Sequence, residues 1–380
     1  MGSSFNSVFF RPYNHIVVIF ILLHLLIGAF ISPLVTSDFE RNLFYGEAFW
    51  EHGFSIYDMT PLQIDPDYAI GDPSSGLLSY PNTTYDYPTI QLLFWAGVSI
   101  LPFPNIVGKW LLSSFDIFNF LIIFYFLKNL QNREEEAEEI KVPEKALALS
   151  YLIFSIPFSA FEGQSTALTV TFFLLPLVLH SNHKYWSYLT VGLGFHWKYV
   201  SLLVLPYLLI KDRKNVNEAI KGLFIVLLTI VLLSFPILFS NFILNYFGFF
   251  GRLSEYSGQL KSNNLYLFHL CISSLLSSVI LVLGFLTWIG FSFSDKKLEV
   301  TIEGLIERAY WIPFLILLSF LKVYSTAFPW YWVWFYPLIM IFPRGERRLY
   351  TKLLGITFAI GVIDFIDITV GLETLIEYFI

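Results

Sequence analysis

The chain has 380 residues, of which 56% are hydrophobic and 14% charged, whereas an ordinary soluble protein has about 25% charged residues. The net charge of −6 and the lack of a basic tract argue against a nucleic-acid partner. A single cysteine, Cys271, excludes a disulfide within the chain. Long continuous apolar runs exclude a β-barrel and indicate an all-α polytopic membrane protein.

Apolar runs recur along the whole chain and predict about eleven membrane spans in a single membrane domain, residues 1–380. The first span, 14–35, is too long for a removable signal peptide and is expected to remain as an anchor. A polar stretch, 36–87, follows it, and the remaining spans lie within 88–372. The predicted spans are 14–35, 88–103, 105–127, 146–160, 164–180, 186–210, 219–239, 264–291, 310–327, 330–343 and 350–372.

Basic residues between the spans predict the orientation, because cytoplasmic loops are rich in Lys and Arg. This rule puts the loops 36–87 and 240–263 outside. The basic residues assigned to the cytoplasm are Arg11, Lys211, Arg213, Lys214, Lys221, Lys296, Lys297, Arg344, Arg347, Arg348 and Lys352. The acidic connector 129–145 stays open. Simple alternation puts it outside, whereas a re-entrant 88–103 would put it inside and the turn 161–165 outside.

The first outer stretch begins with an amphipathic segment. Residues 39–53 predict an interfacial helix that Ser37 or Asp38 can cap and that Gly53 can end. The segment from there to Tyr87 is rich in Asp, Pro, Gly and Tyr. That composition is typical of an irregular, ordered loop that packs sugars on aromatic faces.

Asp38 is the strongest candidate for a catalytic group, because it directly follows the first span. A carboxylate fixed at the membrane surface lies where an enzyme acting on lipid-linked substrates needs a base. The simpler interpretation of Asp38, taken alone, is a helix N-cap. Glu40 lies two residues further on and would point elsewhere on a helix, so the two acids would have different roles.

Lys198 is the clearest charge inside a predicted span, and a charge in hydrocarbon is costly enough to indicate function. It lies near the middle of 186–210. An ammonium there could bind a phosphate that arrives on a polyprenyl chain, and the alternative is a structural pair with Asp116 or Glu162. His196 is open to two interpretations, a polar core residue or a further phosphate contact.

The sequence contains no recognisable set of metal ligands and no glycine-rich loop of the kind that cradles nucleotide phosphates. We therefore expect no metal and no other cofactor. A sugar enzyme of this composition would take an already activated sugar from a lipid carrier rather than from a nucleotide.

Several blocks of the sequence together resemble the glycosyltransferase-C enzymes. Asp38-Phe39-Glu40 is similar to their Asp-x-Asp or Asp-x-Glu motif, with Glu40 in place of the more common Asp. Later blocks are similar to the GPI mannosyltransferase I catalytic subunit, and the bacterial and archaeal polyprenyl-phosphate-mannose-dependent mannosyltransferases share this layout. These blocks are Tyr85 to Thr89, Phe103 to Asn105, Gly108-Lys109, Asp116, Gly192 to Lys198, Leu205-Pro206, Lys322 to Thr326, Trp330 to Trp334 and Pro337.

The resemblance implies a glycosyltransferase-C type bundle and an inverting, metal-independent transfer of a sugar, with mannose expected. The donor would be a polyprenyl- or dolichyl-phosphate sugar and the acceptor a glycolipid or glycan on the outer or lumenal face. The membrane would be the cell membrane, or the endoplasmic reticulum membrane in a eukaryote. Some relatives also need a small accessory subunit.

The resemblance also implies roles for individual residues. Asp38 would be the general base, and Lys198 with His196 would bind the departing phosphate. Arg252 and Lys261, in the second outer loop, are further candidates for that phosphate. Glu40 is expected as a second catalytic residue and would orient acceptor hydroxyls together with Glu47. The other residues expected to contact the substrates are Tyr87, Gln164, Trp330 and Tyr331.

A transporter or flippase for a lipid-linked or anionic substrate is the main competing class, because transporters also carry charges near the membrane midplane. The lack of a recognisable inverted repeat and the acids in the outer loop favour the transferase. An accessory membrane subunit without a substrate is a third alternative. It would explain the aromatic residues but not Lys198 within a span.

Overall fold

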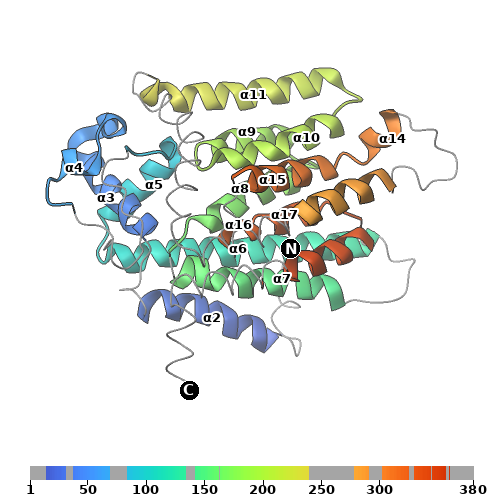
Figure 1. The fold of residues 1–380 in the computed structure, drawn as a ribbon, viewed down its shortest axis with the longest axis horizontal. Coiled ribbons are helices and arrows are strands. Elements are labelled where there is room, and N and C mark those ends of the chain that lie inside the picture. The colour runs from blue at the N-terminus through green and yellow to red at the C-terminus, as the bar shows by residue number, and fades with distance from the viewer. Residues whose placement is uncertain are drawn as a thin grey trace.

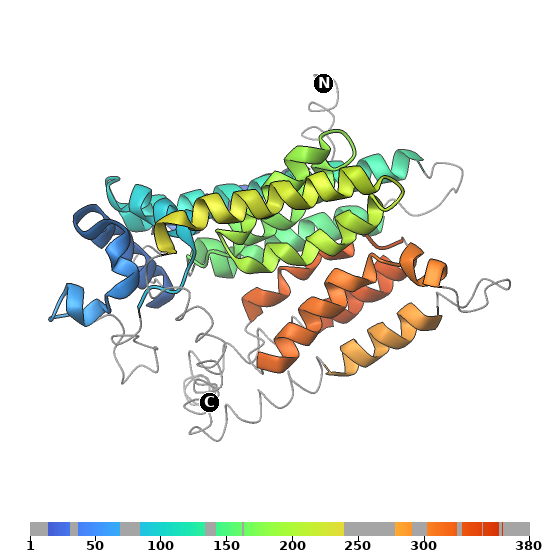
Figure 2. The same cartoon turned by 90° about the horizontal axis from the view of Figure 1, so that it is seen from above.

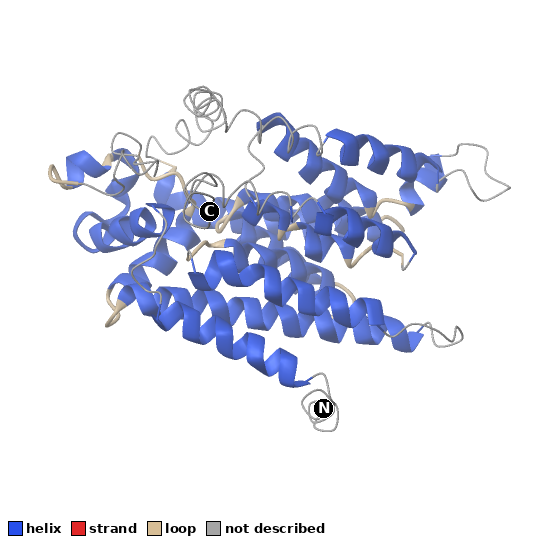
Figure 3. Ribbon diagram, turned by 60° about the horizontal axis from the view of Figure 1, so that its bottom comes forward, coloured by secondary structure: helices blue, strands red, loops and turns tan. Residues whose placement is uncertain are grey.

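The computed structural model of the protein describes residues 14–30, 37–68, 84–133, 142–161, 163–238, 278–290, 302–324, 329–343, 345–356 and 359. This part of the chain consists of helices and their connections and contains no strand (Figure 1, Figure 3). The predicted all-α class is therefore confirmed for the described residues. Arg252, Lys261, Glu162 and Cys271 lie outside them.

The helices follow the apolar runs of the sequence. Their order is α2 (Asn14–Phe30), α3 (Ser37–His52), η1 (Gly53–Asp58), α4 (Pro61–Ile64), α5 (Thr89–Ser99), α6 (Pro104–Arg133), α7 (Val142–Ser155), η3 (Ile156–Phe161), α8 (Thr166–Leu179), α9 (Lys184–Phe195), η4 (Tyr199–Val204), α10 (Leu205–Lys211), α11 (Val216–Ser234), η5 (Phe235–Ile237), α14 (Ile302–Glu307), α15 (Trp311–Tyr324), α16 (Pro329–Trp332) and α17 (Phe335–Ile339). Further helical stretches cover 278–290 and 345–356.

The described helices are consistent with the predicted membrane protein. Two of them, Pro104–Leu127 and Val216–Ile237, are long and apolar enough to cross a membrane, and six shorter apolar helices accompany them. Helix α11 exposes Ile220, Phe224 and Val231 along one face. An exposed apolar surface of this kind marks contact with lipid or with another protein. The number of spans that the sequence predicts stays a prediction.

One end of the bundle is built around α3 and α5, which lie together at the left of Figure 1 and Figure 2. Phe39 of α3 contacts the start of α6, since a Cβ at Gly108 would lie 3.0 Å from its ring. The same ring covers Gly163 between η3 and α8. The end of α11 also reaches this region, where Ile237 joins the apolar cluster around Tyr45.

The opposite end is held by a buried carboxylate, Asp212, at the end of α10. Lys184 Nζ lies 2.9 Å and His180 Nε2 3.3 Å from Asp212 Oδ1. The Tyr188 hydroxyl donates to Asp212 Oδ2 at 2.9 Å. These contacts join α8, α9 and α10 at the end where the basic residues 211–214 lie, away from α3.

Helix α5 is shorter than the predicted span 88–103. Its 11 residues rise about 16 Å, roughly half of the hydrocarbon thickness of a membrane. It packs on α3, and α6 starts beside it. Because α6 begins and α7 ends near α3, the end of α6 and the start of α7 lie at the opposite end of the bundle. The packing therefore favours the re-entrant alternative for 88–103 over a complete span.

The predicted span 186–210 is wrong as a single continuous helix. Helix α9 ends at Phe195 and η4 begins at Tyr199, and between them Lys198 has an extended backbone with φ −148° and ψ 128°. The sequence placed Lys198 near the middle of a span. The structure places it at a helix break that faces the α3 end.

Two local features produce this break. At Gly194 an added Cβ would lie 2.8 Å from the Ser201 side chain, so the close return of the chain requires a glycine. The carbonyl oxygen of His196 accepts the N–H groups of Ile90 and Gln91 at 3.0 and 3.2 Å. These N–H groups belong to the first turn of α5, where a helix leaves N–H groups without intrahelical partners, although the Gln91 N–H is shared with the Pro88 carbonyl at 3.1 Å. Helix α5 and the break thus stabilise each other.

The contact between α3 and α5 can be tested at Gly46, where a Cβ would lie 2.5 Å from the backbone oxygen of Trp95. We expect Gly46→Ala to lower the free energy of unfolding by about 1–3 kcal/mol, because a rigid backbone must move. Gly97→Ala is the control, since nothing lies within 4 Å of its Cβ position. It should be neutral or stabilising by about 0.5–1 kcal/mol. Denaturant titration in detergent measures both, and equal losses would contradict the close approach.

Candidate active site

Asp38 lies in the first turn of α3, next to Ser37 at its start. The predicted interfacial segment is therefore helical, and it begins two residues earlier than expected, within the usual uncertainty of helix ends. The backbone carbonyl of Asp38 accepts a hydrogen bond from Asn42 Nδ2 at 2.7 Å. Gly53 follows the helix with a φ of +57°, which confirms it as the predicted end of the helix.

Phe39 fixes the start of α3 against the turn between η3 and α8. Its ring is buried and meets Trp95 edge-on at 4.9 Å. Gly163 beneath it has a φ of +73°, and a Cβ there would lie 2.2 Å from the Phe39 ring. Both the positive φ and the lack of room for a Cβ require glycine at this position. Gln164, the next residue, then donates a side-chain hydrogen bond to Asp38.

Lys198 is held by aromatic rings. Its Nζ lies 5.6 Å from the ring centre of Tyr87 and 5.3 Å from that of Trp334, distances at which an ammonium is attracted to the ring faces. The side chain is partly buried. It makes no hydrogen bond or ion pair with any residue that the structure describes. Its N–H donors are therefore available to an anion.

Asp38 and Lys198 share one electrostatic site. Burial raises the pKa of the Asp38 carboxyl above its usual value of 3.8. The positive charges of Arg41 and Lys198 oppose this increase, and the negative charge of Asp86 adds to it. The two residues that sequence analysis singled out as base and phosphate ligand thus act on each other through space.

Glu40 faces different surroundings. Burial alone raises the pKa of its carboxyl, and its charge acts on the hydroxyl of Tyr68. The expectation that Asp38 and Glu40 point in different directions on a helix is therefore confirmed. Glu47, one helical turn or more beyond, is exposed on α3.

Arg41 and Asp86 form a buried ion pair beside Asp38. Arg41 Nη1 lies 3.0 Å from Asp86 Oδ1, and the two side chains are 4% and 12% exposed. Arg41 Nη2 also donates to the backbone carbonyl of Thr84 at 2.9 Å. Sequence analysis did not single out Arg41, because an arginine on an amphipathic helix normally faces water. Its partner Asp86 lies 45 positions away in the sequence, so no local sequence pattern indicates the pair.

The late aromatic block belongs to the same site. The rings of Tyr331 and Trp334 are 4.6 Å apart. Burial raises the pKa of the Tyr87 hydroxyl, and Asp38, Asp86 and Tyr331 raise it further. Trp334 was not among the expected contacts, although the run Trp330-Tyr331-Trp332-Val333-Trp334 signals the block. Its buried indole N–H has no partner among the described residues. Trp330 packs against Phe158 at 6.4 Å.

His196 and Asp116 have other partners. The ring Nε2 of the buried His196 donates to the backbone carbonyl of Ile230 on α11 at 3.0 Å. The Asp116 carboxylate accepts a hydrogen bond from the Tyr151 hydroxyl at 2.5 Å, inside the bundle. An ion pair between Lys198 and Asp116, one of the structural alternatives, is not found. In the described ranges no three His, Cys, Asp or Glu side chains gather around a possible metal position.

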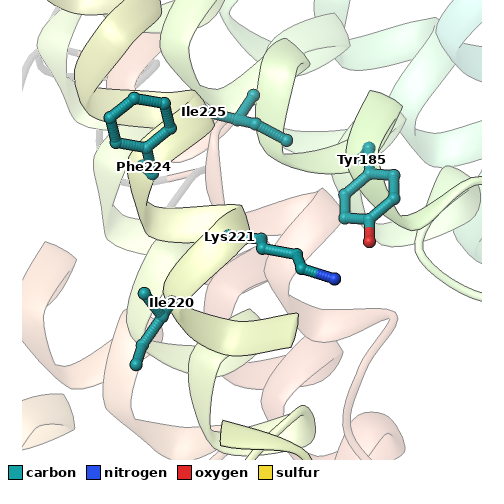
Figure 4. A pocket seen from close by; sticks show the side chains of 5 residues that line it. All are labelled: Tyr185, Ile220, Lys221, Phe224 and Ile225. Carbon is teal, nitrogen blue, oxygen red and sulfur yellow. The ribbon is translucent and has the colours of Figure 1, made fainter. Parts of the chain in front are cut away.

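A shallow pocket of about 490 Å³ lies between α9 and α11 (Figure 4). Tyr185, Ile220, Lys221, Phe224 and Ile225 line it. Its polar groups are already used, because Tyr185 and Lys221 both bind Glu218, at 2.8 and 3.0 Å. The pocket lies near the starts of α9 and α11, whereas Lys198 follows the end of α9. It is therefore separate from the cluster around Asp38.

Comparison with known families gives one match. The model of glycosyltransferase family 87 covers residues 85–306, more than half of the chain. The matched region contains Asp86, Tyr87, Gln164 and Lys198, while Asp38 precedes it. No curated protein matches the chain.

The buried carboxyl of Asp38 should cost stability. Its pKa is raised in the folded state, so the ionised form is disfavoured by folding and this cost grows as the pH rises through that pKa. We expect Asp38→Asn to increase the free energy of unfolding at pH 7 by about 0.5–2 kcal/mol, the range of single stabilising changes. The gain should shrink as the pH falls toward 3.8, the usual value of the group.

Thermal unfolding in detergent at several pH values measures this difference. Glu51→Gln is the control, because Glu51 is exposed on the same helix and its charge is solvated. A pH-independent change for Asp38→Asn, or the same change for Glu51→Gln, would contradict the burial of the Asp38 charge.

Proposed function

Since the chain belongs to glycosyltransferase family 87, and is therefore a membrane glycosyltransferase, we propose that its donor is a polyprenyl- or dolichyl-phosphate sugar. The acceptor is a hydroxyl of a glycolipid or glycan. We assign mannose as the sugar, because the sequence blocks around Asp38, Lys198 and Trp330 resemble those of mannosyltransferases that use such donors.

The observation that best supports this proposal is the environment of the Lys198 ammonium. It is partly buried, it lies between the faces of Tyr87 and Trp334, and it has no ion pair with a described residue. A protein rarely buries a charge without a partner. A phosphate brought by a lipid carrier would supply that partner, and the electrostatic influence of Lys198 on Asp38 supports an anion site near the candidate base.

The proposed reaction uses both charges in one step. The ionised Asp38 takes the proton of the acceptor hydroxyl as its oxygen forms a bond to the anomeric carbon. The bond from that carbon to the phosphate oxygen breaks, and the electron pair leaves with the polyprenyl phosphate. The transition state resembles an oxocarbenium ion. Lys198 stabilises the charge that grows on the phosphate, in a site that holds little water.

The remaining assignments follow from position. Gln164 orients the Asp38 carboxylate by its hydrogen bond. Tyr331 packs against Trp334, and Trp330 packs against Tyr331, so these rings continue the aromatic surface next to Lys198. Glu40 and Glu47 stay candidates for acceptor hydroxyls. His196, Arg252 and Lys261 stay candidates for the phosphate, and the small accessory subunit stays a possible partner.

The arrangement of the bundle supports an active site on the outer or lumenal face of the membrane. Lys211, Arg213 and Lys214 lie at the Asp212 end of the bundle, and Asp38 lies on α3 at the opposite end. Because basic residues stay preferentially in the cytoplasm, the Asp38 end faces outward. The donor lipid would then reach Lys198 from the outer leaflet.

We predict that Asp38→Asn and Lys198→Met differ in their effects on kcat and donor KM. Purified protein in liposomes is given a labelled polyprenyl-phosphate mannose and a panel of glycolipid and glycan acceptors. Asp38→Asn should lower kcat about 10²–10⁴-fold with little effect on donor KM, because it removes the base. Lys198→Met should raise donor KM and also lower kcat about 10²–10³-fold, because it removes the stabilising cation.

Lys221→Met and Glu51→Gln are the matched controls, since each removes the same type of charge from an exposed helical position. Both should transfer at the wild-type rate. Wild-type transfer from a nucleotide sugar in place of the lipid donor would refute the proposed donor. Undiminished transfer by Asp38→Asn would refute the proposed base.

A further inference from the structure

The segment 84–88 joins the two charges of the site. Its Asp86 carboxylate and its Thr84 carbonyl are both bound by the guanidinium of Arg41 on α3, at 3.0 and 2.9 Å. The next residue, Tyr87, lies against the Lys198 ammonium at 5.6 Å. One arginine side chain thus connects the helix that carries Asp38 with the ring that holds Lys198.

Further hydrogen bonds show that this segment is fixed to α3 along its length. The Tyr85 hydroxyl donates to Asn42 Oδ1 at 3.1 Å, and Asn42 donates in turn to the Asp38 carbonyl. The Tyr57 hydroxyl donates to the backbone carbonyl of Tyr87 at 3.1 Å. Tyr57 and Tyr85 are completely buried. The ion pair is the charged part of this framework, and both of its charges act on Asp38.

We propose that the Arg41–Asp86 ion pair is a positioning pair for the transfer reaction: it fixes Tyr87 against Lys198 and sets the charge around Asp38. This inference rests on the proposed function, because it assigns a role within that reaction. Neither residue is needed to touch the substrates. Arginine suits the task, because its planar fork binds a carboxylate and a carbonyl at once, which a lysine cannot do.

The electrostatic part of the inference follows from the groups around Asp38 in the part of the chain that the structure describes. These are Arg41 from α3, Asp86 from the segment 84–88, Lys198 from the break after α9, and the uncharged Gln164 and Tyr87. Arg41 and Lys198 favour the ionised carboxylate, and Asp86 disfavours it. Removing Arg41 and removing Asp86 must therefore change the ionisation of Asp38 in opposite directions.

The test compares Arg41→Gln, Asp86→Asn and the double variant by the pH dependence of kcat. Transfer needs ionised Asp38, so the rate falls on the acid side. Arg41→Gln should move this acid limb to higher pH, because it removes a positive charge that favours the Asp38 carboxylate. Asp86→Asn should move it to lower pH, and the double variant should return toward the wild type. Acid limbs that coincide in all four proteins would overturn the proposal.

Arg41→Lys distinguishes the effect of the positive charge at position 41 from the effect of the two contacts that the guanidinium makes. It keeps the positive charge, so the acid limb should stay near that of the wild type, while kcat should fall about tenfold because the Thr84 carbonyl loses its donor. Arg41→Gln leaves Asp86 buried without a partner and is the variant most exposed to misfolding. If it does not fold, Asp86→Asn retains the test, because its acid limb should move to lower pH. The double variant, which carries an uncharged pair, is then the control and should titrate like the wild type.

A second readout does not depend on transfer. The carboxyl stretching band of Asp38 is followed by infrared spectroscopy over pH, with Asp38→Asn as the reference. If the Asp38 titration moves in opposite directions in Arg41→Gln and Asp86→Asn, the positioning pair is supported even when the wild type transfers no sugar. The lack of transfer would then refute only the proposed function. Transfer by the wild type with no displacement in either variant would refute the positioning pair alone.

Discussion

The site depends on keeping ionised groups charged inside a largely apolar protein. A carboxylate or an ammonium taken out of water is costly unless opposite charges and hydrogen bonds compensate it. Asp38, Arg41, Asp86 and Lys198 meet this constraint as a group, because two acids and two bases act on one another. When all four are ionised their charges cancel. The charges of Arg41 and Asp86 compensate each other by direct contact. The Lys198 ammonium instead lies against aromatic rings and can still bind an incoming anion.

Glycines make this grouping of charges possible. Gly163 lets the Phe39 ring lie directly on the turn before α8, and so brings Gln164 to Asp38. Gly194 lets the chain return after α9 and places Lys198 at a break rather than within a helix. At Gly46 the backbones of α3 and α5 approach so closely that a methyl group would not fit. Small residues in the sequence thus decide where the charged residues meet.

The sequence identifies charged residues of the candidate site better than it predicts their geometry. The position of Asp38 after an apolar run, and the cost of a charge at Lys198, were both readable from residue type and spacing. The break at Lys198 was not, because it depends on N–H groups of Ile90 and Gln91 from a different helix. Arg41 and Asp86 were missed for the same reason, since a pair 45 positions apart leaves no local pattern. The sequence left two alternatives for 88–103, a complete span and a re-entrant segment. The packing of the short α5 against α3 favours the re-entrant segment.

A structure of the protein with a non-transferable phosphonate analogue of the lipid-linked sugar would reveal where the donor binds. We expect a phosphonate oxygen at about 2.7–2.9 Å from Lys198 Nζ, the distance of a charge-assisted hydrogen bond. The anomeric carbon should lie on the side of the Asp38 carboxylate, with room for an acceptor hydroxyl between them. A phosphonate bound at the Asp212 end, or one that reaches Lys198 while its sugar points away from Asp38, would contradict the shared site.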